Sequence, residues 1–365
     1  MTRVVAFFIA LGLSVAAWPA GDFQVESVVS GLEHPWALAF LPDGRLLVTE
    51  RPGRLRVVAD GELIEAPVGG VPDAFVRGQG GLMDVALDPR YEETGWIYLT
   101  LAYGESGAST TRLVRGRLRD MRWVDSEVLF TAEPFRQRPV HYGGRIAFLG
   151  DGTLLLTLGD GFDDREQAQE LGNHIGAIVR LNRDGSVPAD NPFVGRDGAL
   201  AAIYSYGHRN PQGIVHDPVA DTTWAHEHGP RGGDELNRIE PGGNYGWPVA
   251  TTGIDYSGAR ISPFTEQPGM RSPELEWTPS IAPAGMSQYR GALFADWDGD
   301  LLVASLVEQT IRRIDLDGME VRGQSTLALD LGQRLRDIRV GPDGALYILT
   351  DQENGELLRI TPAGR

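Results

Sequence analysis

The sequence predicts an all-β fold, a six-bladed β-propeller whose blades are four-stranded antiparallel sheets. The first observation is repetition, because an apolar stretch, a turn rich in Asp, Pro and Gly, and a second apolar run recur six times. The second is hairpin chemistry, since Asp-Gly and Asp-Pro turns join short alternating or β-branched runs. The third is that helical periodicity is nearly absent, with only residues 164–171 resembling a helix.

The six copies begin near Trp36, Gly81, Gly144, Gly213, Tyr289 and Leu335. Repeats of about 40–50 residues that each hold several short strands are typical of propeller blades. We therefore expect residues 21–365 to form a single propeller domain, with insertions that stretch some of the spacings. A propeller of seven or eight blades is the alternative if weak blades escape the pattern.

The N-terminus, residues 1–20, has the pattern of a secretory signal peptide. Arg3 precedes an apolar run from Val4 to Ala17, and small residues near Ala16 suit cleavage. The run is too short for a spanning helix, so we expect no stable membrane insertion of the mature chain. The segment predicts a periplasmic or secreted protein, and an uncleaved N-terminal anchor is the alternative.

Composition excludes several classes of function. The 33 basic and 50 acidic residues give a formal net charge of −17, which argues against nucleic acid or an anionic membrane as partner. The chain contains no lysine, so a Schiff-base lysine and a phosphate-binding P-loop lysine are excluded. It also contains no cysteine, which excludes disulfides, thiolate metal sites and cysteine nucleophiles.

Residues 207–248 form the stretch richest in candidate site residues. They hold four of the seven histidines, and Gly or Pro interrupts them every few residues. Such backbone often faces a ligand or an ion, although a plain surface loop is the alternative. The GPRGGDELN segment suits a cation bound by backbone carbonyls and carboxylates, as Ca²⁺ prefers. The histidines could instead bind a transition metal, but no HExxH-like spacing is present.

A second group of polar residues shares one position relative to the copies, just before an apolar run. Its members are Gln79, His141, Arg209, Asn210, Arg334 and Arg336. Because loops at equivalent blade edges surround the channel on one face of a propeller, we expect these side chains to converge on one pocket.

The chemistry of this pocket follows from its residue types. Three arginines suggest a ligand with several carboxylates or phosphates. His141 with Asp160, one strand further along, suggests a general base held in one tautomer. A structural histidine and a solvated strand edge are the alternatives for the single residues.

The order and spacing of several motifs resemble one known family. These motifs are GQGGLMDVALDP, HYGGRIAF, LGDG, IVRLNRDGSVPADNPF, YGHRNPQG, EHGPRGGDELN, GGNYGWP, PSIAPAGM and RLRDIRVGPDGALYILTD. Together they span residues 36–360, nearly the whole mature chain. They are similar to motifs of the soluble aldose sugar dehydrogenases that use pyrroloquinoline quinone (PQQ), relatives of soluble quinoprotein glucose dehydrogenase.

The resemblance implies oxidation of aldose sugars at the anomeric carbon to lactones, with electrons passed to an external acceptor by a monomer or homodimer. It implies that His141 takes the proton of the anomeric hydroxyl while hydride passes to PQQ, and that Asp160 orients His141. It implies PQQ contacts from Gln79, His141, Arg209, Asn210, Arg334 and Arg336, with Tyr256 beside the cofactor and Arg209 also stabilising charge on the reduced quinone. It implies a catalytic Ca²⁺ on the carbonyls of Gly229 and Pro230, and a structural Ca²⁺ at Glu235 and Tyr245.

Two departures separate this chain from the glucose dehydrogenase branch of that family. Val140 precedes the presumed base where that branch has an aspartate, and the fifth copy has no cofactor-contacting lysine. The departures imply membership of the broader aldose branch, fewer ionic contacts to PQQ, and an open sugar preference. The alternatives in other classes are a Ca²⁺-dependent lactonase or esterase propeller and a non-catalytic propeller that binds carbohydrate or protein.

Overall fold

The computed structural model describes residues 16–18, 22–327 and 329–364. Of the predicted signal peptide, residues 1–20, only 16–18 belong to this part, and the rest lies outside the described residues. Those three residues form strand β1 (Ala16–Trp18), which pairs in parallel with β22 (Glu320–Leu327). No helix in the described part is both long and apolar enough to cross a bilayer.

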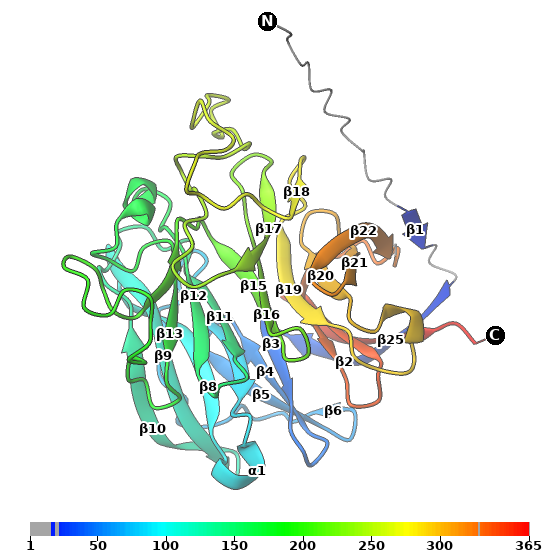
Figure 1. Ribbon diagram of the computed structural model, residues 1–365. Helices are drawn as coiled ribbons and strands as arrows, with labels where there is room; N and C mark the ends of the chain where they lie inside the picture. Colours follow the sequence, from blue (N-terminus) through cyan, green and yellow to red (C-terminus); the bar gives the residue numbers. More distant parts are fainter. Residues whose placement is uncertain (1–15, 19–21, 328, 365) are drawn as a thin grey trace, which may run out of the picture.

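Six sheets of four antiparallel strands surround a common axis, with β1 added to one of them, so the prediction of a six-bladed β-propeller is confirmed (Figure 1). The innermost strand of each sheet contacts the innermost strands of its two neighbours, which closes the ring. In chain order the inner strands are β3 (Pro35–Phe40), β7 (Leu82–Leu87), β11 (Gly143–Phe148), β15 (Pro211–Asp217), β19 (Pro283–Gln288) and β23 (Leu335–Val340).

The remaining strands follow in order toward the outside of each sheet. The second strands are β4 (Leu46–Glu50), β8 (Ile97–Glu105), β12 (Leu154–Leu158), β16 (Thr222–Glu227), β20 (Leu301–Ser305) and β24 (Leu346–Thr350). The third strands are β5 (Arg54–Ala59), β9 (Ala108–Arg119), β13 (Ala177–Leu181), β17 (Asp234–Ile239), β21 (Ile311–Asp317) and β25 (Gly355–Pro362). The outer strands are β6 (Glu62–Leu63), β10 (Arg122–Thr131), β14 (Ile203–Tyr206), β18 (Leu275–Trp277), β22 and β2 (Phe23–Leu32).

The helical segments are few and short. The described residues contain the single-turn helix α1 (Tyr91–Thr94) and two 3₁₀ turns, Arg165–Gln169 and Ala295–Trp297. The first 3₁₀ turn lies inside the stretch in which the sequence resembles a helix. The expected start of the fifth copy at Tyr289 is wrong, because the inner strand β19 ends one residue before it.

The sixth sheet is completed from the other end of the chain. Strand β2 pairs with β25 in an antiparallel register that runs from Phe23 opposite Pro362 to Leu32 opposite Gly355. The sheet therefore has the order β2-β25-β24-β23, and the ring is held shut by hydrogen bonds between the first and last blade strands.

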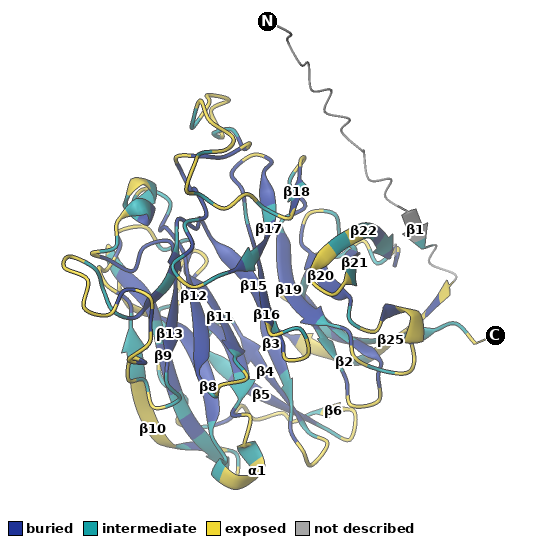
Figure 2. Ribbon diagram, viewed as in Figure 1, coloured by how far each residue is buried: buried dark blue, intermediate teal, exposed yellow. Residues whose placement is uncertain are grey.

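The hydrophobic core lies between the blades. Each of the six large clusters of buried apolar side chains joins two neighbouring sheets, for example Leu47 of β4 with Leu99 of β8. Inner and second strands are buried on both faces, whereas β10 presents many exposed residues to solvent (Figure 2). Burial on two faces explains why these strands are nearly continuous apolar runs.

A network of buried charges crosses the central channel. Arg145 of β11 contacts Asp84 of β7 at 3.4 Å and Asp337 of β23 at 3.0 Å. Arg339 of β23 contacts the same two carboxylates at 3.1 and 3.0 Å. The guanidinium of Arg145 also lies 3.9 Å from the ring centre of Trp36 in β3. Ion pairs thus link three blades across the channel, the contact of Arg145 with Trp36 adds the first blade, and both supplement the apolar contacts between neighbouring blades.

Candidate active site

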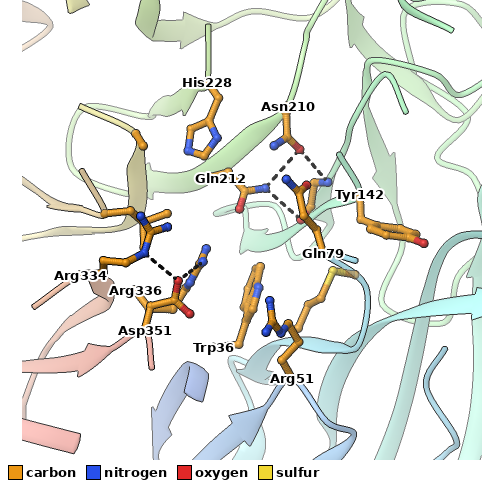
Figure 3. A pocket seen from close by; sticks show the side chains of 14 residues that line it. Trp36, Arg51, Gln79, Tyr142, Asn210, Gln212, His228, Arg334, Arg336 and Asp351 are labelled. Atoms are coloured by element: carbon orange, nitrogen blue, oxygen red, sulfur yellow. Dashed lines mark hydrogen bonds and ion pairs between the residues drawn. The ribbon is translucent and has the colours of Figure 1, made fainter. Parts of the chain in front are cut away.

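A cavity of about 220 Å³ lies where the inner strands begin (Figure 3). Every blade contributes to it at or just before its inner strand, as the shared position of the sequence motifs predicts. The contributing residues, in blade order, are Trp36, Gln79, Tyr142 with Gly143, Asn210, Ala282, and Arg334 with Arg336.

A second set of lining residues comes from the ends of the second strands. Arg51 follows β4, His228 follows β16, Leu306 follows β20 and Asp351 follows β24. Arg51, Leu306 and Asp351 were not predicted as site residues, and His228 was considered only among the histidines that could bind a transition metal. Asp160 comes two residues after β12, one position further along than these. A polar residue directly after the second apolar run of a copy is the signal that could have found Arg51, His228 and Asp351, but not Leu306.

A second cavity adjoins the first, and a third, small cavity adjoins the second. The second, of about 820 Å³, shares His228 and Ala282 with the first and is also lined by Gly229, Pro230 and Tyr256. The small one, also lined by Pro230 and Tyr256, contains Asp160 and Arg209. Nine of the twelve predicted site residues therefore line these neighbouring cavities, and His141 is not one of the lining residues. Glu235 and Tyr245 line none of these cavities and lie within the fourth blade.

His141 lines none of these cavities itself, but it hydrogen-bonds to a lining residue of the first cavity, Gln79, and to one of the small cavity, Asp160. Its backbone N–H donates to Oε1 of Gln79 at 2.8 Å, and its ring Nδ1 lies 2.6 Å from Oδ1 of Asp160. Asp160 also accepts hydrogen bonds at 2.8 Å from the backbone N–H of Phe162 and from Nε1 of Trp247. The carboxylate is thereby fixed from three directions, and it orients the imidazole in turn.

The protonation states follow from burial and from this contact. Burial raises the pKa of Asp160, but its hydrogen bond from His141 and that residue's charge outweigh burial and bring the pKa below its usual value. The ionised carboxylate can only accept, so Nδ1 of His141 carries the proton and Nε2 keeps its lone pair. Burial lowers the pKa of His141 below 6.5, against the opposing effect of Asp160. A neutral imidazole with a free Nε2 can act as a general base.

The backbone around His141 is strained. His141 has a φ of 52° and Phe162 a φ of 73°, a conformation that bulky residues seldom adopt. Gly159 permits the first of these, because a Cβ there would lie 2.0 Å from the carbonyl oxygen of His141. The ring of Phe162 meets the His141 ring edge-on, with centroids 5.4 Å apart, and stacks against Tyr256 at 6.2 Å. Strain of this kind is concentrated at functional sites.

Arg209 is held at the border between the cavities. Its NH1 donates to the carbonyls of His228 at 3.0 Å and Gly229 at 2.7 Å, and its own backbone N–H donates to the carboxylate of Glu227. The side-chain oxygen of Asn210 accepts from the backbone N–H of Gly143 at 3.2 Å. Its amide nitrogen donates to none of the described residues, which leaves a donor for a ligand.

The cavity fits a polyanionic ligand such as PQQ. Arg336 and Arg334 contact Asp351 at 2.8 and 3.4 Å, and the buried Nε of Arg336 has no partner among the described residues. Burial raises the pKa of Asp351, but the charge and hydrogen bond of Arg336 outweigh it and lower this pKa to about 2. Positive charge still exceeds negative charge in the lining, and partly desolvated guanidinium groups suit carboxylates.

The donor set for a cation beside this cavity consists of backbone carbonyls. The backbone carbonyl of Pro230 accepts no hydrogen bond from the described residues. The backbone carbonyl of Gly229 accepts one only from Arg209. Asp234 is not a free ligand, because it accepts from the backbone N–H of Gly229 and from Ser280, Ile281 and Ala282. Carbonyl oxygens fit Ca²⁺, which would complete its coordination with other oxygens.

The predicted structural Ca²⁺ site is less complete. Glu235 lies opposite Glu227 on β16, and burial followed by the Glu227 charge raises the pKa of its carboxyl, which a nearby cation would reverse. The hydroxyl of Tyr245 is occupied, since it donates to the carbonyl of Arg238 at 2.6 Å and accepts from Glu240 at 2.8 Å. Only the backbone carbonyl of Tyr245 could bind a metal. In the described residues no cluster of three or more His, Asp or Glu forms a metal site.

Comparisons with known proteins agree with this geometry. A family model described as Glucose / Sorbosone dehydrogenase matches residues 32–359. The chain belongs to this family. Among its relatives in the glucose/sorbosone dehydrogenase family, aldose sugar dehydrogenase YliI of Escherichia coli is 42% identical over 357 residues, which cover 96% of each protein. Quinoprotein glucose dehydrogenase B of Acinetobacter calcoaceticus is 28% identical over 420 residues, with 90% of this chain and 86% of that protein covered.

The solved structures include a glucose/sorbosone dehydrogenase relative with its cofactor. The PQQ-bound form of an aldose sugar dehydrogenase from Streptomyces coelicolor superimposes with a TM-score of 0.74 at 29% identity. The alignment covers 94% of this chain and 99% of that structure. The relatives are sugar dehydrogenases, so family membership supports oxidoreductase chemistry on sugars.

Proposed function

We propose that the protein is a PQQ- and Ca²⁺-dependent dehydrogenase that oxidises aldose sugars at the anomeric carbon to lactones and passes the electrons to an external acceptor. The observation that carries this proposal is the buried His141–Asp160 pair beside an arginine-rich cavity. A PQQ-bound relative of the same fold supports it. The predicted signal peptide adds the proposal that oxidation takes place in the periplasm or outside the cell.

The residues around the cavities have different roles in the proposed reaction. When bound, PQQ supplies the acceptor for the hydride of the sugar C1–H bond, and Ca²⁺ supplies a Lewis acid. His141 takes the proton of the anomeric hydroxyl on Nε2, while Asp160 holds the ring and stabilises the imidazolium that forms. Gln79, Asn210, Arg334 and Arg336 would hold the cofactor, with Tyr256 bordering it. Arg209 would face the developing negative charge, and the carbonyls of Gly229 and Pro230 would bind Ca²⁺.

The test is a titration of the purified protein with PQQ in the presence of Ca²⁺, followed by dye reduction with a panel of aldoses. The wild type should bind PQQ and reduce the dye with several sugars. Arg336→Ala should weaken PQQ binding about 10- to 150-fold, the range for a lost hydrogen bond to a charged group. Arg336→Lys should recover only part, because the planar two-pronged contact is lost.

Arg322→Ala is the matched control, because Arg322 is an exposed arginine on β22 paired with Asp317 and Glu320. It should bind PQQ as the wild type does. Absence of PQQ binding by the wild type would refute the proposal. Lactone hydrolysis that needs Ca²⁺ and survives Arg336→Ala would favour the lactonase alternative. Sugar binding without turnover in the presence of PQQ would favour a binding propeller.

A further inference from the structure

Arg51 of the first blade is a cavity-lining arginine that was not among the predicted site residues. It directly follows β4, is half-buried, and lines the cavity of about 220 Å³ together with Trp36, Arg334 and Arg336 (Figure 3). Its place directly after the second strand of its blade is equivalent to that of His228 in the fourth blade and Asp351 in the sixth.

The backbone at Arg51 is fixed from both neighbouring segments. Its N–H donates to the carbonyl of His34 at 3.0 Å, and its carbonyl accepts from Leu82 at 3.2 Å. Gly81, with a φ of 155°, passes so close that a Cβ would lie 2.0 Å from the carbonyl oxygen of Arg51 and 2.7 Å from its Cγ. These contacts fix where the Arg51 side chain starts, so its direction into the cavity is set by the fold.

The guanidinium of Arg51 has no hydrogen bond or ion pair with any described residue. The two other arginines of the cavity differ from it, since Arg334 and Arg336 both contact Asp351. Three guanidinium groups thus face one carboxylate in the lining, a formal excess of 3 − 1 = +2. The charge of Arg51 acts on Asp351 and helps to lower the pKa of that carboxyl, but no direct ion pair is made. Its guanidinium therefore remains available to bind an anionic group of a ligand.

The position of Arg51 suits a flat ligand with separated anionic groups. In Figure 3, Trp36 lies between Arg51 and the group formed by Arg334, Arg336 and Asp351. The indole is held in place by Arg145, 3.9 Å from its ring centre. Aromatic rings of a ligand can contact the indole while carboxylates at different edges reach different guanidinium groups. The chain has no lysine, so any cationic contact to such carboxylates must come from arginine.

We propose that Arg51 binds one carboxylate of PQQ, separately from the carboxylate bound by Arg334 and Arg336. This inference rests on the proposed function and deepens it, because it assigns the first blade a direct part in cofactor binding. It also revises the expectation of few ionic contacts to the cofactor: the arginine that sequence motifs did not reveal supplies a further one.

The test compares PQQ titrations of the Ca²⁺-supplemented wild type, Arg51→Gln and Arg51→Lys. Arg51→Gln should raise the Kd for PQQ about tenfold and make binding less sensitive to salt, since one charge-assisted contact is lost. Arg51→Lys should keep the salt sensitivity and lose less affinity. Without PQQ, the melting temperature of Arg51→Gln should be close to that of the wild type, because the removed guanidinium makes no hydrogen bond or ion pair, and its attraction to Asp351 is offset by repulsion from two other arginines.

Arg45→Gln is the matched control, because Arg45 lies at the other end of β4 and pairs with Asp43 on the surface. It should leave the Kd for PQQ unchanged. A wild type that binds PQQ while Arg51→Gln binds within twofold of it would overturn the inference alone. A wild type that binds no PQQ would overturn the proposed function as well. A clear drop in melting temperature for Arg51→Gln without PQQ would show that Arg51 is structural, which also overturns the inference.

Discussion

Nδ1 of His141 lies 2.6 Å from Oδ1 of Asp160, and this contact opposes the effect of burial on the imidazole. Burial lowers the pKa of His141 and the carboxylate raises it, with burial the larger effect. Under the proposed mechanism, His141 must be neutral to accept a proton. The kcat/KM of the wild type should therefore rise with pH through a pKa below 6.5 and then level off.

Asp160→Asn should move this acid limb to lower pH. The substitution removes the charge that raises the His141 pKa, so burial acts unopposed. The rate on the plateau should also fall, because the tautomer with a free Nε2 is no longer enforced. The measurement is kcat/KM between pH 4 and 8 on protein saturated with PQQ and Ca²⁺. If kcat/KM of the variant rises at the same pH as in the wild type, or at a higher pH, the assigned role of Asp160 is contradicted.

His141→Ala should reduce kcat about 10²- to 10⁴-fold, the usual contribution of a positioned base. PQQ binding should persist, since the cavity keeps its arginines. The control is His216→Ala, which alters a histidine near the other end of β15 that contacts Thr223 and Gly150. Near-normal turnover in His141→Ala would remove this residue from the mechanism.

Acid should destabilise the fold in part through His174. Burial lowers its pKa from 6.5 to about 4, and Nδ1 of the ring accepts a hydrogen bond from the backbone N–H of Glu133 at 3.1 Å. Because the pKa of His174 is lower in the folded state, the neutral ring contributes its full stability at a pH above the unfolded-state pKa of about 6.5. That stability is lost as the pH falls from 6.5 toward 4, and amounts to about 3 kcal/mol at 1.36 kcal/mol per unit.

The measurement is urea unfolding of the wild type and His174→Asn across this pH range. The variant should be less stable at pH 7 but show a shallower loss toward pH 4. Phe130→Leu is the control, because it weakens the aromatic contact with His174 at 5.0 Å yet keeps the imidazole. Parallel curves for all three proteins would argue against a buried neutral His174.

Arg145→Met should destabilise the protein by about 3–5 kcal/mol, the cost of removing one partner from a buried ionic network. Asp84 and Asp337 would then share only Arg339. Arg45→Gln, which breaks an exposed pair, should cost less than about 0.5 kcal/mol. Equal unfolding free energies of the two variants in urea would show that the channel network contributes little.

Chelation by EDTA should abolish activity and lower the melting temperature, because a cation bound only by the folded loop stabilises it by about 2.7 kcal/mol at one hundred times Kd. Ca²⁺ should restore both properties, and Zn²⁺ should do so poorly, given oxygen ligands. Glu235→Gln should reduce the Ca²⁺-dependent rise in melting temperature, unlike Glu62→Gln at an exposed position of β6. An unchanged melting temperature and activity after chelation would refute the cation sites.

Much of the fold and of the site region could be predicted from local signals. Asp-Gly turns and short apolar runs indicate blades, and the residues before each inner strand, such as Gln79 and Asn210, do line one cavity. The partner of β2 could not be predicted, because its pairing with β25 joins opposite ends of the chain and leaves no local pattern. Arg51 and Asp351 were missed since each follows an apolar run, where a polar residue looks like an ordinary turn.

The closure of the sixth sheet has a consequence for the order in which the protein can mature. Strands β2 and β25 need residues 23 and 362 together, so no partial chain can close the ring. Because the cavity takes side chains from all six blades, it is complete only when the sixth sheet has closed. Under the proposed function, PQQ binding follows the pairing of β2 with β25, and a variant that lacks β25 should not bind PQQ.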